Sequence, residues 1–283
     1  MIAAAVRPRG PFSLRLSARL VGDATRTKAD GPLTAALASG GVGQAWQQPD
    51  GIVQLRAPDE RGIDELRFVL ALDADHSEFL ERFRADPLLG AALPQLRGLR
   101  PVRVATVTQA LLRAVCGQLI QAKRAREIER AVIRATTAAI PGTRLHAPPT
   151  PASFASIAPA RLRRFGLGAR RGATLVRLSR SLDLERLRGL PTAAAAARLG
   201  RERGLGPWSV GVICLEGLGR YERGIVGDLG LVKLCSALRG RWVETWETAE
   251  LLEPYGEWAG LASVYLLAAS RLGLVPLPRQ AAA

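Results

Sequence analysis

Two glycines separated by a single residue, Gly204 and Gly206, restrict the fold of this chain more than any other local feature. The alanine-rich run after Thr192 favours a helix, Thr192 is a good N-cap, and Gly204 accepts the positive φ that ends a helix. Pro207 suits the first turn of a second helix. The sequence therefore predicts two helices joined by a tight hairpin within residues 190–219.

The predicted hairpin has the properties of an anion site. The first N–H groups of its second helix lack intrahelical partners, and the helix dipole favours negative charge there. A lone pair of glycines is equally typical of an ordinary helix end, so the pair by itself does not identify a ligand. The residues expected to contact a phosphate are Gly204, Leu205, Gly206, Pro207 and Ser209.

A carboxylate, Asp228, follows the hairpin at the start of a third helical pattern, in residues 226–234. Asp is among the best N-cap residues, so a purely structural role is the ordinary interpretation. A carboxylate held beside C1′ of a nucleotide also stabilises the positive charge that develops as an N-glycosidic bond breaks, and it can orient or deprotonate water. The two roles are compatible.

These residues, Gly204, Leu205, Gly206 and Asp228, resemble the motif of the helix-hairpin-helix DNA glycosylase superfamily (HhH-GPD). The resemblance covers roughly residues 100–272, and the first hundred residues match only in outline. It implies a binding hairpin and a catalytic aspartate in one helical protein.

Trp208 separates this chain from part of that superfamily. Members with lyase activity carry a lysine nucleophile two positions after the second hairpin glycine, where this chain has Trp208. Together with the tracts 108–121 and 149–154, the tryptophan is similar to the DNA-3-methyladenine glycosylase II family. The resemblance implies a monofunctional DNA glycosylase of base excision repair. It would flip alkylated purines, of the 3-methyladenine or 7-methylguanine type, out of duplex DNA and release them by hydrolysis, with Asp228 as catalytic carboxylate and no lyase activity.

Two other functions fit the same residues. A helix-hairpin-helix module can bind distorted DNA without catalysis, although a pure phosphate binder gains nothing from Asp228 near the DNA backbone. A glycosylase of this superfamily can also act on another lesion, an oxidised or deaminated base. Release of free base from a panel of lesions distinguishes these functions.

The resemblance also implies which residue fills the space that a flipped nucleotide leaves. It places this DNA wedge at Gln118 and Leu119. The alternative is that Leu119 packs in the core, because it shares a helix face with Leu111 and Val115.

The base pocket implied by the resemblance is less aromatic than in the related proteins. Trp208 and Tyr265 match expected rings, but Val212 and Val264 stand where further rings are expected. An electron-poor alkylated base gains a cation–π interaction from each ring, so the loss of rings weakens that preference.

The remainder of the chain predicts a mainly α protein in two parts. Alternation at residues 12–20 and 51–56, and the apolar run 66–72, indicate strands, so residues 1–100 are expected to form an α+β domain with an antiparallel sheet. Residues 101–283 are expected to form an all-helical body, in which two helical subdomains flank a cleft as the resemblance implies. Helical patterns occupy residues 75–83, 106–138, 150–158, 168–182 and 255–272.

The charge of the chain agrees with a nucleic-acid partner. A formal net charge of +15 attracts a polyanion, here expected to be double-stranded DNA containing damaged bases. Because arginine and alanine richness can also follow genomic base composition, the charge is supporting information only. Residues 123–126 and 161–171 are candidate backbone contacts. A monomer suits an enzyme that scans DNA.

Cysteine spacing and hydropathy restrict cofactors and location. Cys116, Cys214 and Cys235 lack Cys-x-x-Cys spacing, so we expect no disulfide framework, zinc site or iron–sulfur cluster. No cofactor is expected, and a monovalent or divalent cation at the hairpin is left open. Arg7 and Arg9 interrupt the apolar N-terminal stretch and no run reaches membrane-spanning length, so we expect a cytoplasmic, nucleoid-associated protein without a membrane partner.

Overall fold

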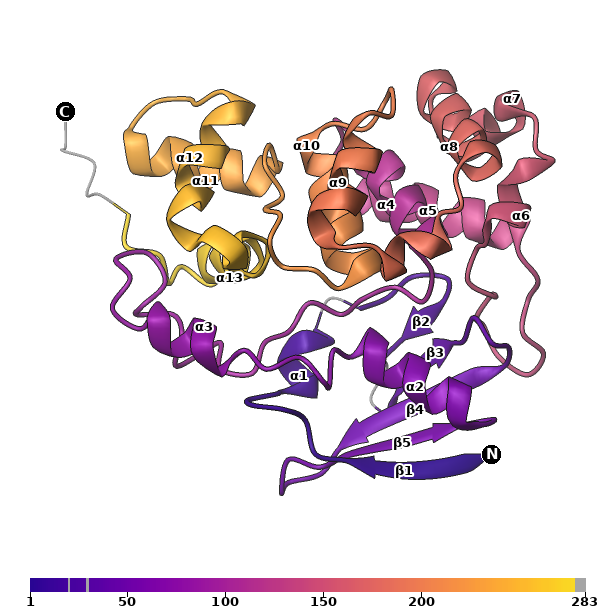
Figure 1. The fold of residues 1–283 in the computed structure, drawn as a ribbon, viewed down its shortest axis with the longest axis horizontal. Coiled ribbons are helices and arrows are strands. Elements are labelled where there is room, and N and C mark those ends of the chain that lie inside the picture. Colours follow the sequence, from indigo (N-terminus) through magenta and orange to yellow (C-terminus); the bar gives the residue numbers. More distant parts are fainter. Residues whose placement is uncertain (20, 29–30, 278–283) are drawn as a thin grey trace.

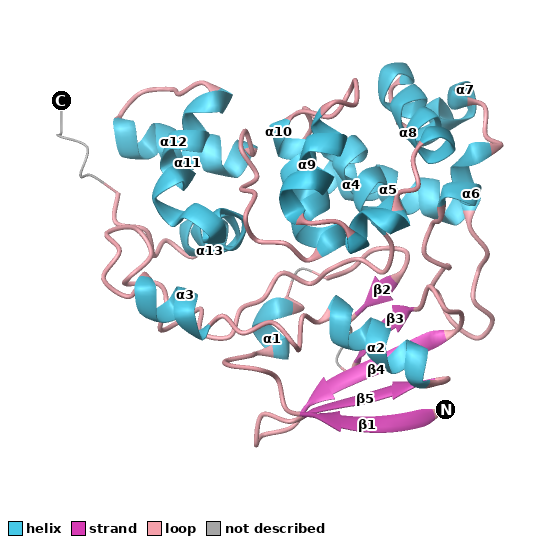
Figure 2. Ribbon diagram, viewed as in Figure 1, coloured by secondary structure: helices cyan, strands magenta, loops and turns pink. Residues whose placement is uncertain are grey.

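The computed structural model describes residues 1–19, 21–28 and 31–277. Figures 1 and 2 show a layer of helices over a small sheet from the N-terminal part of the chain. The strands follow the order β1-β5-β4-β3-β2, and each neighbouring pair is antiparallel. Their bounds are β1 Ile2–Val6, β2 Arg26–Thr27, β3 Leu33–Ala36, β4 Val42–Gln47 and β5 Val53–Ala57.

Alternating side chains along β5 explain how the sheet packs. Val53 and Leu55 are fully buried, and the residues between and after them face the other side of the sheet. Helix α2 (Glu60–Val69) covers the buried face. The contact is close at Gly43, where a Cβ would lie 2.8 Å from Cδ1 of Leu66.

The helical layer contains most of the chain, so the fold is mainly α with a small antiparallel sheet. Figure 1 shows α11, α12 and α13 grouped at one end and α4 to α10 forming the rest of the layer. Within the described residues, no helix is both long and apolar enough to cross a membrane. The further α-helices are α1 Leu14–Ser17, α3 Ser77–Arg82, α4 Val107–Gly117, α5 Ala122–Thr136, α6 Pro151–Ala155, α7 Pro159–Leu162, α8 Ala169–Ser181, α9 Thr192–Gly200, α10 Pro207–Val212, α11 Leu229–Arg239, α12 Thr248–Leu252 and α13 Ala259–Arg271.

Among the described residues, two large hydrophobic cores and a small third cluster at Val232, Cys235 and Val243 are present. One large core lies between the sheet and α2 and extends along the sequence to Leu72. The other fills the helical layer and already includes Phe79, Leu89 and Leu96. Residues 79–99 therefore pack with the helices. The domain boundary at residue 100 stays a prediction, and the end of the second predicted domain, residues 278–283, lies outside the described residues.

Two of the predicted strands are wrong. Residues 12–20 contain the short helix α1, whose N-cap Ser13 accepts a hydrogen bond from the N–H of Leu16, and Leu20 lies outside the described residues. Residues 66–72 contain the end of α2, which begins where the Asp59 carboxylate accepts from the N–H of Gly62. In both places a local N-cap starts a helix that the apolar pattern alone does not reveal.

The single helix predicted over residues 106–138 is interrupted. Helix α4 ends at Gly117 and α5 begins at Ala122, and between them Leu119 has a φ of +58°. The apolar pattern continues across the break, so periodicity alone could not reveal it. We call residues 118–121 the wedge turn.

Candidate active site

The predicted hairpin is present between α9 and α10. Gly204 has a φ of +95°, and the N–H of Leu205 donates to the carbonyl of Glu202 to close the turn. Gly206 is the N-cap of α10 and Pro207 its first residue. Thr192 is the first residue of α9 rather than its cap, and its hydroxyl donates to Glu222 over 2.7 Å.

The start of α10 remains suited to an anion. Gly206 and Pro207 are exposed, whereas Leu205 and Ser209 are buried. The N–H groups of the first helical turn have no partner within the helix, and α10 continues into a π turn, Ile213–Leu218. The hairpin therefore presents backbone donors at an exposed corner, with buried side chains holding it in place.

Asp228 lies at the start of α11, as predicted, and has two partners. Its Oδ1 accepts from the N–H of Gly230 over 2.8 Å, and its Oδ2 accepts from Nε1 of Trp208 over 3.2 Å. The preceding Gly227 has a φ of +86° and donates its N–H to the Thr248 hydroxyl over 2.7 Å. The carboxylate is half-buried and fixed from both sides.

Trp208 also contacts the end of α4, next to the wedge turn. A Cβ on Gly117 would lie 2.4 Å from Cη2 of Trp208, so only glycine leaves room for the indole at the end of α4. The same ring donates to Asp228. Sequence reasoning did not identify Gly117, although a glycine at the end of a helical pattern next to a predicted wedge was a usable signal.

Leu119 projects fully into solvent, with a relative exposure of 104%. The alternative that it packs in the core is wrong, because α4 ends before it and the chain turns with a positive φ. Gln118 lies beside it, and its Nε2 donates to the carbonyl of Gly204 over 2.8 Å and to the Ser209 hydroxyl over 3.0 Å. The wedge turn is thus joined directly to the hairpin.

The other predicted pocket residues are less accessible. Tyr265 is fully buried, its hydroxyl donates to the carbonyl of Leu99 over 3.0 Å, and its ring lies 5.0 Å from that of Phe79. Burial raises the pKa of its phenol. Val212 is buried and Val264 is half-buried. The structure does not bring Tyr265 to the open side of the site.

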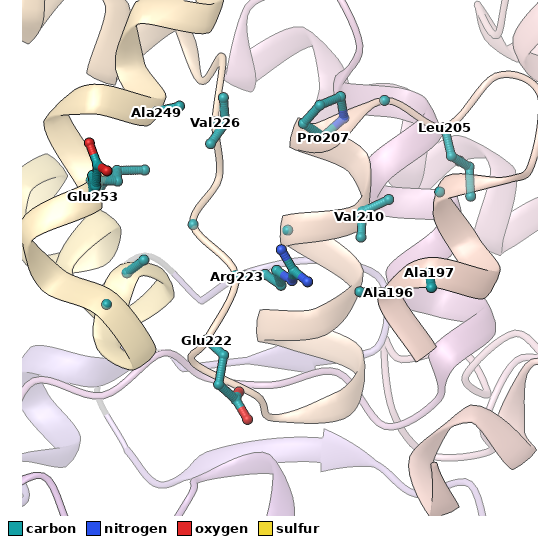
Figure 3. A pocket seen from close by; sticks show the side chains of 17 residues that line it. Ala196, Ala197, Leu205, Pro207, Val210, Glu222, Arg223, Val226, Ala249 and Glu253 are labelled. Carbon is teal, nitrogen blue, oxygen red and sulfur yellow. The ribbon is translucent and has the colours of Figure 1, made fainter. Parts of the chain in front are cut away.

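A separate pocket lies beside the hairpin, between α9, α10 and α12. Its volume is about 450 Å³, and its lining includes Pro207, Val210, Leu252 and Arg223. Figure 3 shows Pro207 and Val210 along one wall and Arg223 near the centre. Neither Trp208 nor Asp228 lines it, so this pocket is distinct from the predicted base pocket. A cleft between two helical subdomains is expected from the sequence, and this pocket lies between α9 and α10 on one side and α12 on the other (Figure 1).

The cysteines have the buried positions expected of core residues. Burial raises the pKa of Cys214 to about 11 and that of Cys116 further. Within the described residues, no group of three or more His, Cys, Asp or Glu could hold a metal ion. The cation left open at the hairpin would use backbone carbonyls, and the prediction about it stays a prediction.

Several known proteins are similar to this chain in sequence or in fold. No protein-family model matches the chain. A DNA-3-methyladenine glycosylase of Bacillus subtilis is 26% identical over 204 residues, which are 69% of this chain and 67% of that protein. The structure resembles a 3-methyladenine DNA glycosylase from Archaeoglobus fulgidus (TM-score 0.82, 17% identity, 95% of this chain and 98% of the other). It also resembles a Clostridium acetobutylicum 8-oxoguanine glycosylase/lyase in complex with double-stranded DNA (TM-score 0.78, 17% identity, 96% and 98%). The chain therefore has the fold of the helix-hairpin-helix DNA glycosylase superfamily, which its sequence also resembles.

Proposed function

We propose that the protein is a monofunctional DNA glycosylase that releases alkylated purines from duplex DNA. One observation carries this proposal: the half-buried carboxylate of Asp228 lies beside the hairpin and accepts a hydrogen bond from Trp208, whose ring packs against Gly117 just before the wedge turn. A DNA-binding module without catalysis has no use for an acidic group at this place. The similar proteins of Bacillus subtilis and Archaeoglobus fulgidus are both named 3-methyladenine DNA glycosylases, which supports the same lesion class.

The proposed binding step uses the backbone and the wedge. The N–H groups at the start of α10 bind a phosphate of the damaged strand without reading its sequence. The exposed side chain of Leu119 enters the base stack and occupies the space of the extruded nucleotide. Unstacking costs roughly a few kcal/mol, and a damaged base costs less, which favours lesions over normal pairs.

The proposed chemical step is hydrolysis at C1′. The N-glycosidic bond breaks with its electron pair leaving on the base, and an alkylated purine that already carries positive charge departs as a neutral base. The Asp228 carboxylate stabilises the oxocarbenium character of the sugar and takes a proton from the attacking water, whose oxygen bonds to C1′. Its bonds from Gly230 and Trp208 fix its orientation before the reaction.

The proposal includes no lyase step. An indole cannot form the Schiff base with C1′ on which such a step depends, and Trp208 occupies the position of the lyase lysine. The chemistry needs no metal or organic cofactor. We further propose that the protein acts as a cytoplasmic, nucleoid-associated monomer.

A lesion panel tests the proposal. Duplexes carrying 3-methyladenine, 7-methylguanine, 8-oxoguanine or a deaminated base are incubated with the protein, free bases are identified by mass spectrometry, and strand breaks are measured on gels. We expect free alkylated purine and no strand break before alkali. Release of 8-oxoguanine together with strand breaks would show that the protein is a glycosylase/lyase. If no base is released from any duplex, the protein is a DNA-binding module without catalysis.

A further inference from the structure

The wedge turn is held in a conformation that its own residues do not favour. Leu119 combines a φ of +58°, which is uncommon for a non-glycine residue, with complete exposure of an apolar side chain. Free in solution, such a turn would relax its backbone and cover the side chain. Backbone strain of this kind persists only where the surrounding structure determines it, and it often occurs at functional sites.

Arg171 is the charged group that fixes this turn. It lies in the first turn of α8, and its Nη1 donates to the carbonyl of Gln118 over 3.0 Å and to that of Cys116 over 3.4 Å. These carbonyls belong to the last residues of α4 and the start of the wedge turn, where a helix leaves acceptors unpaired and favours a cation. The guanidinium is half-buried and is directed at the protein backbone.

Gln118 fixes the same turn from the other side. Its side chain donates to the hairpin carbonyl of Gly204 and to Ser209, while its own carbonyl accepts from Arg171. Gly117, one residue earlier, has the Trp208 ring against it. Three contacts from three directions therefore determine the peptide units immediately before Leu119.

We propose that Arg171 is a positioning residue that keeps Leu119 extended for insertion into DNA and that, through Gln118, makes the wedge and the phosphate-binding hairpin one rigid unit. Arg171 acts through the protein backbone and not by contact with a phosphate. The inference rests on the proposed function for its DNA substrate. It does not depend on base release, because wedge insertion can be measured without catalysis.

The experiment compares binding to two duplexes, one intact and one with a tetrahydrofuran abasic site, whose gap accepts a wedge without flipping. We expect Arg171→Ala to lower the preference for the abasic duplex roughly tenfold, as for the loss of a charge-assisted hydrogen bond. Arg170→Ala is the matched control, since it removes the same charge from the same exposed helix start. It should weaken binding to both duplexes equally. Thermal denaturation of each variant checks folding.

A double-mutant cycle with the wedge identifies the route of the effect. Leu119→Ala should remove the preference, and adding Arg171→Ala to it should change nothing further, because the positioned side chain is already absent. Arg171→Lys, which keeps a cationic donor, should restore part of the preference. Equal weakening on both duplexes by Arg171→Ala, or additive losses in the double variant, would show a phosphate contact and overturn the inference.

The outcomes separate this inference from the proposed function. A protein that releases no base but prefers the abasic duplex in an Arg171-dependent manner contradicts the enzyme and keeps the inference. A protein that releases base but shows no Arg171-dependent preference for the abasic duplex supports the enzyme and contradicts the inference about Arg171.

Discussion

Charge is arranged differently at the edge of the helical layer that carries Asp228 and Leu119, which we propose faces DNA, and at the junction of that layer with the sheet. At the edge, Asp228 is half-buried with two neutral donors, and Leu119 is fully exposed. At the junction, Arg113 is surrounded by three carboxylates, with 2.7 Å to Asp23, 2.9 Å to Glu129 and a further ion pair to Glu216. The charges at the junction are paired with one another, whereas the carboxylate at the edge has no cationic partner in its hydrogen bonds from Gly230 and Trp208, and the proposed function assigns it to the substrate.

The pKa values of the junction carboxylates depend on their pairing with arginine. Burial raises the pKa of Asp23, but Arg26 and Arg113 outweigh burial and hold that pKa well below its usual range. Burial also raises the pKa of Glu129, and Arg113 offsets it only in part. The junction therefore depends on Arg113. Variants at the junction should change stability, whereas variants at the edge that carries Asp228 should change activity.

Arg113→Met should give the largest effect. It leaves the buried carboxylate of Glu129 without its ion-pair partner, while Asp23 keeps Arg26, so we expect a loss of about 3–5 kcal/mol in the free energy of unfolding. Urea denaturation measures this loss. Base release per folded molecule should change little, and a loss below about 1 kcal/mol would contradict the role given to the junction.

Asp228→Asn should have the converse effect. Loss of one electrostatic partner of the transition state should lower single-turnover base release by about 100- to 1,000-fold. Asn is also a good N-cap, so the free energy of unfolding should change by less than about 1 kcal/mol. Duplex affinity serves as the control and should be retained. A variant that still releases base at the wild-type rate would remove Asp228 from the mechanism.

Gly117→Ala tests whether a displacement of the Trp208 ring changes stability or base release. The added Cβ would lie 2.4 Å from Cη2, so the indole must move away from its place beside Asp228. We expect a cost of about 1–3 kcal/mol, divided between stability and base release. Gly189→Ala is the matched control, since a Cβ there meets nothing within 4 Å. Equal behaviour of both variants would show that the indole position is unimportant.

Within the range from pH 7.0 to 5.5, His76 should give the smallest effect, confined to stability. Burial and, secondarily, Arg100 and Arg103 lower its pKa to about 3, while Asp75 opposes them. Below the unfolded-state value of 6.5, the unfolded chain binds a proton that the folded chain does not. This contribution is complete above pH 6.5 and is lost as the pH falls toward 3, at up to about 1.4 kcal/mol per pH unit.

His76→Phe keeps a ring beside Tyr221 and removes the titration. The free energy of unfolding should therefore decrease less between pH 7.0 and pH 5.5 in this variant than in the wild-type protein. Identical pH dependence of the two proteins would show that His76 is protonated in the folded state.

The sequence predicted those parts of the site that depend only on residues close together in the chain. The turn at Gly204 and the N-cap at Asp228 each depend on one residue and its nearest neighbours, and both are present. The break after Gly117 depends instead on the contact with Trp208, ninety-one residues later in the sequence. Periodicity cannot reveal such a contact.

Long-range pairing explains the remaining differences. Arg113 and Asp23 are separated by 90 residues, so no motif indicated their ion pair. Tyr265 matched a family position by sequence, but its hydroxyl bonds the backbone of Leu99, on a segment that sequence reasoning assigned to the other domain. The resemblance to the family predicted which residue occupies this position, but not which residues it contacts.

The close approach of Trp208 to Gly117 restricts how relatives of this chain can diverge. Side-chain volume at the two positions cannot change independently, because the indole already occupies the space a Cβ would need. A larger residue at the end of α4 must be accompanied by a smaller ring at the start of α10. We therefore expect substitutions at these two sites to occur together.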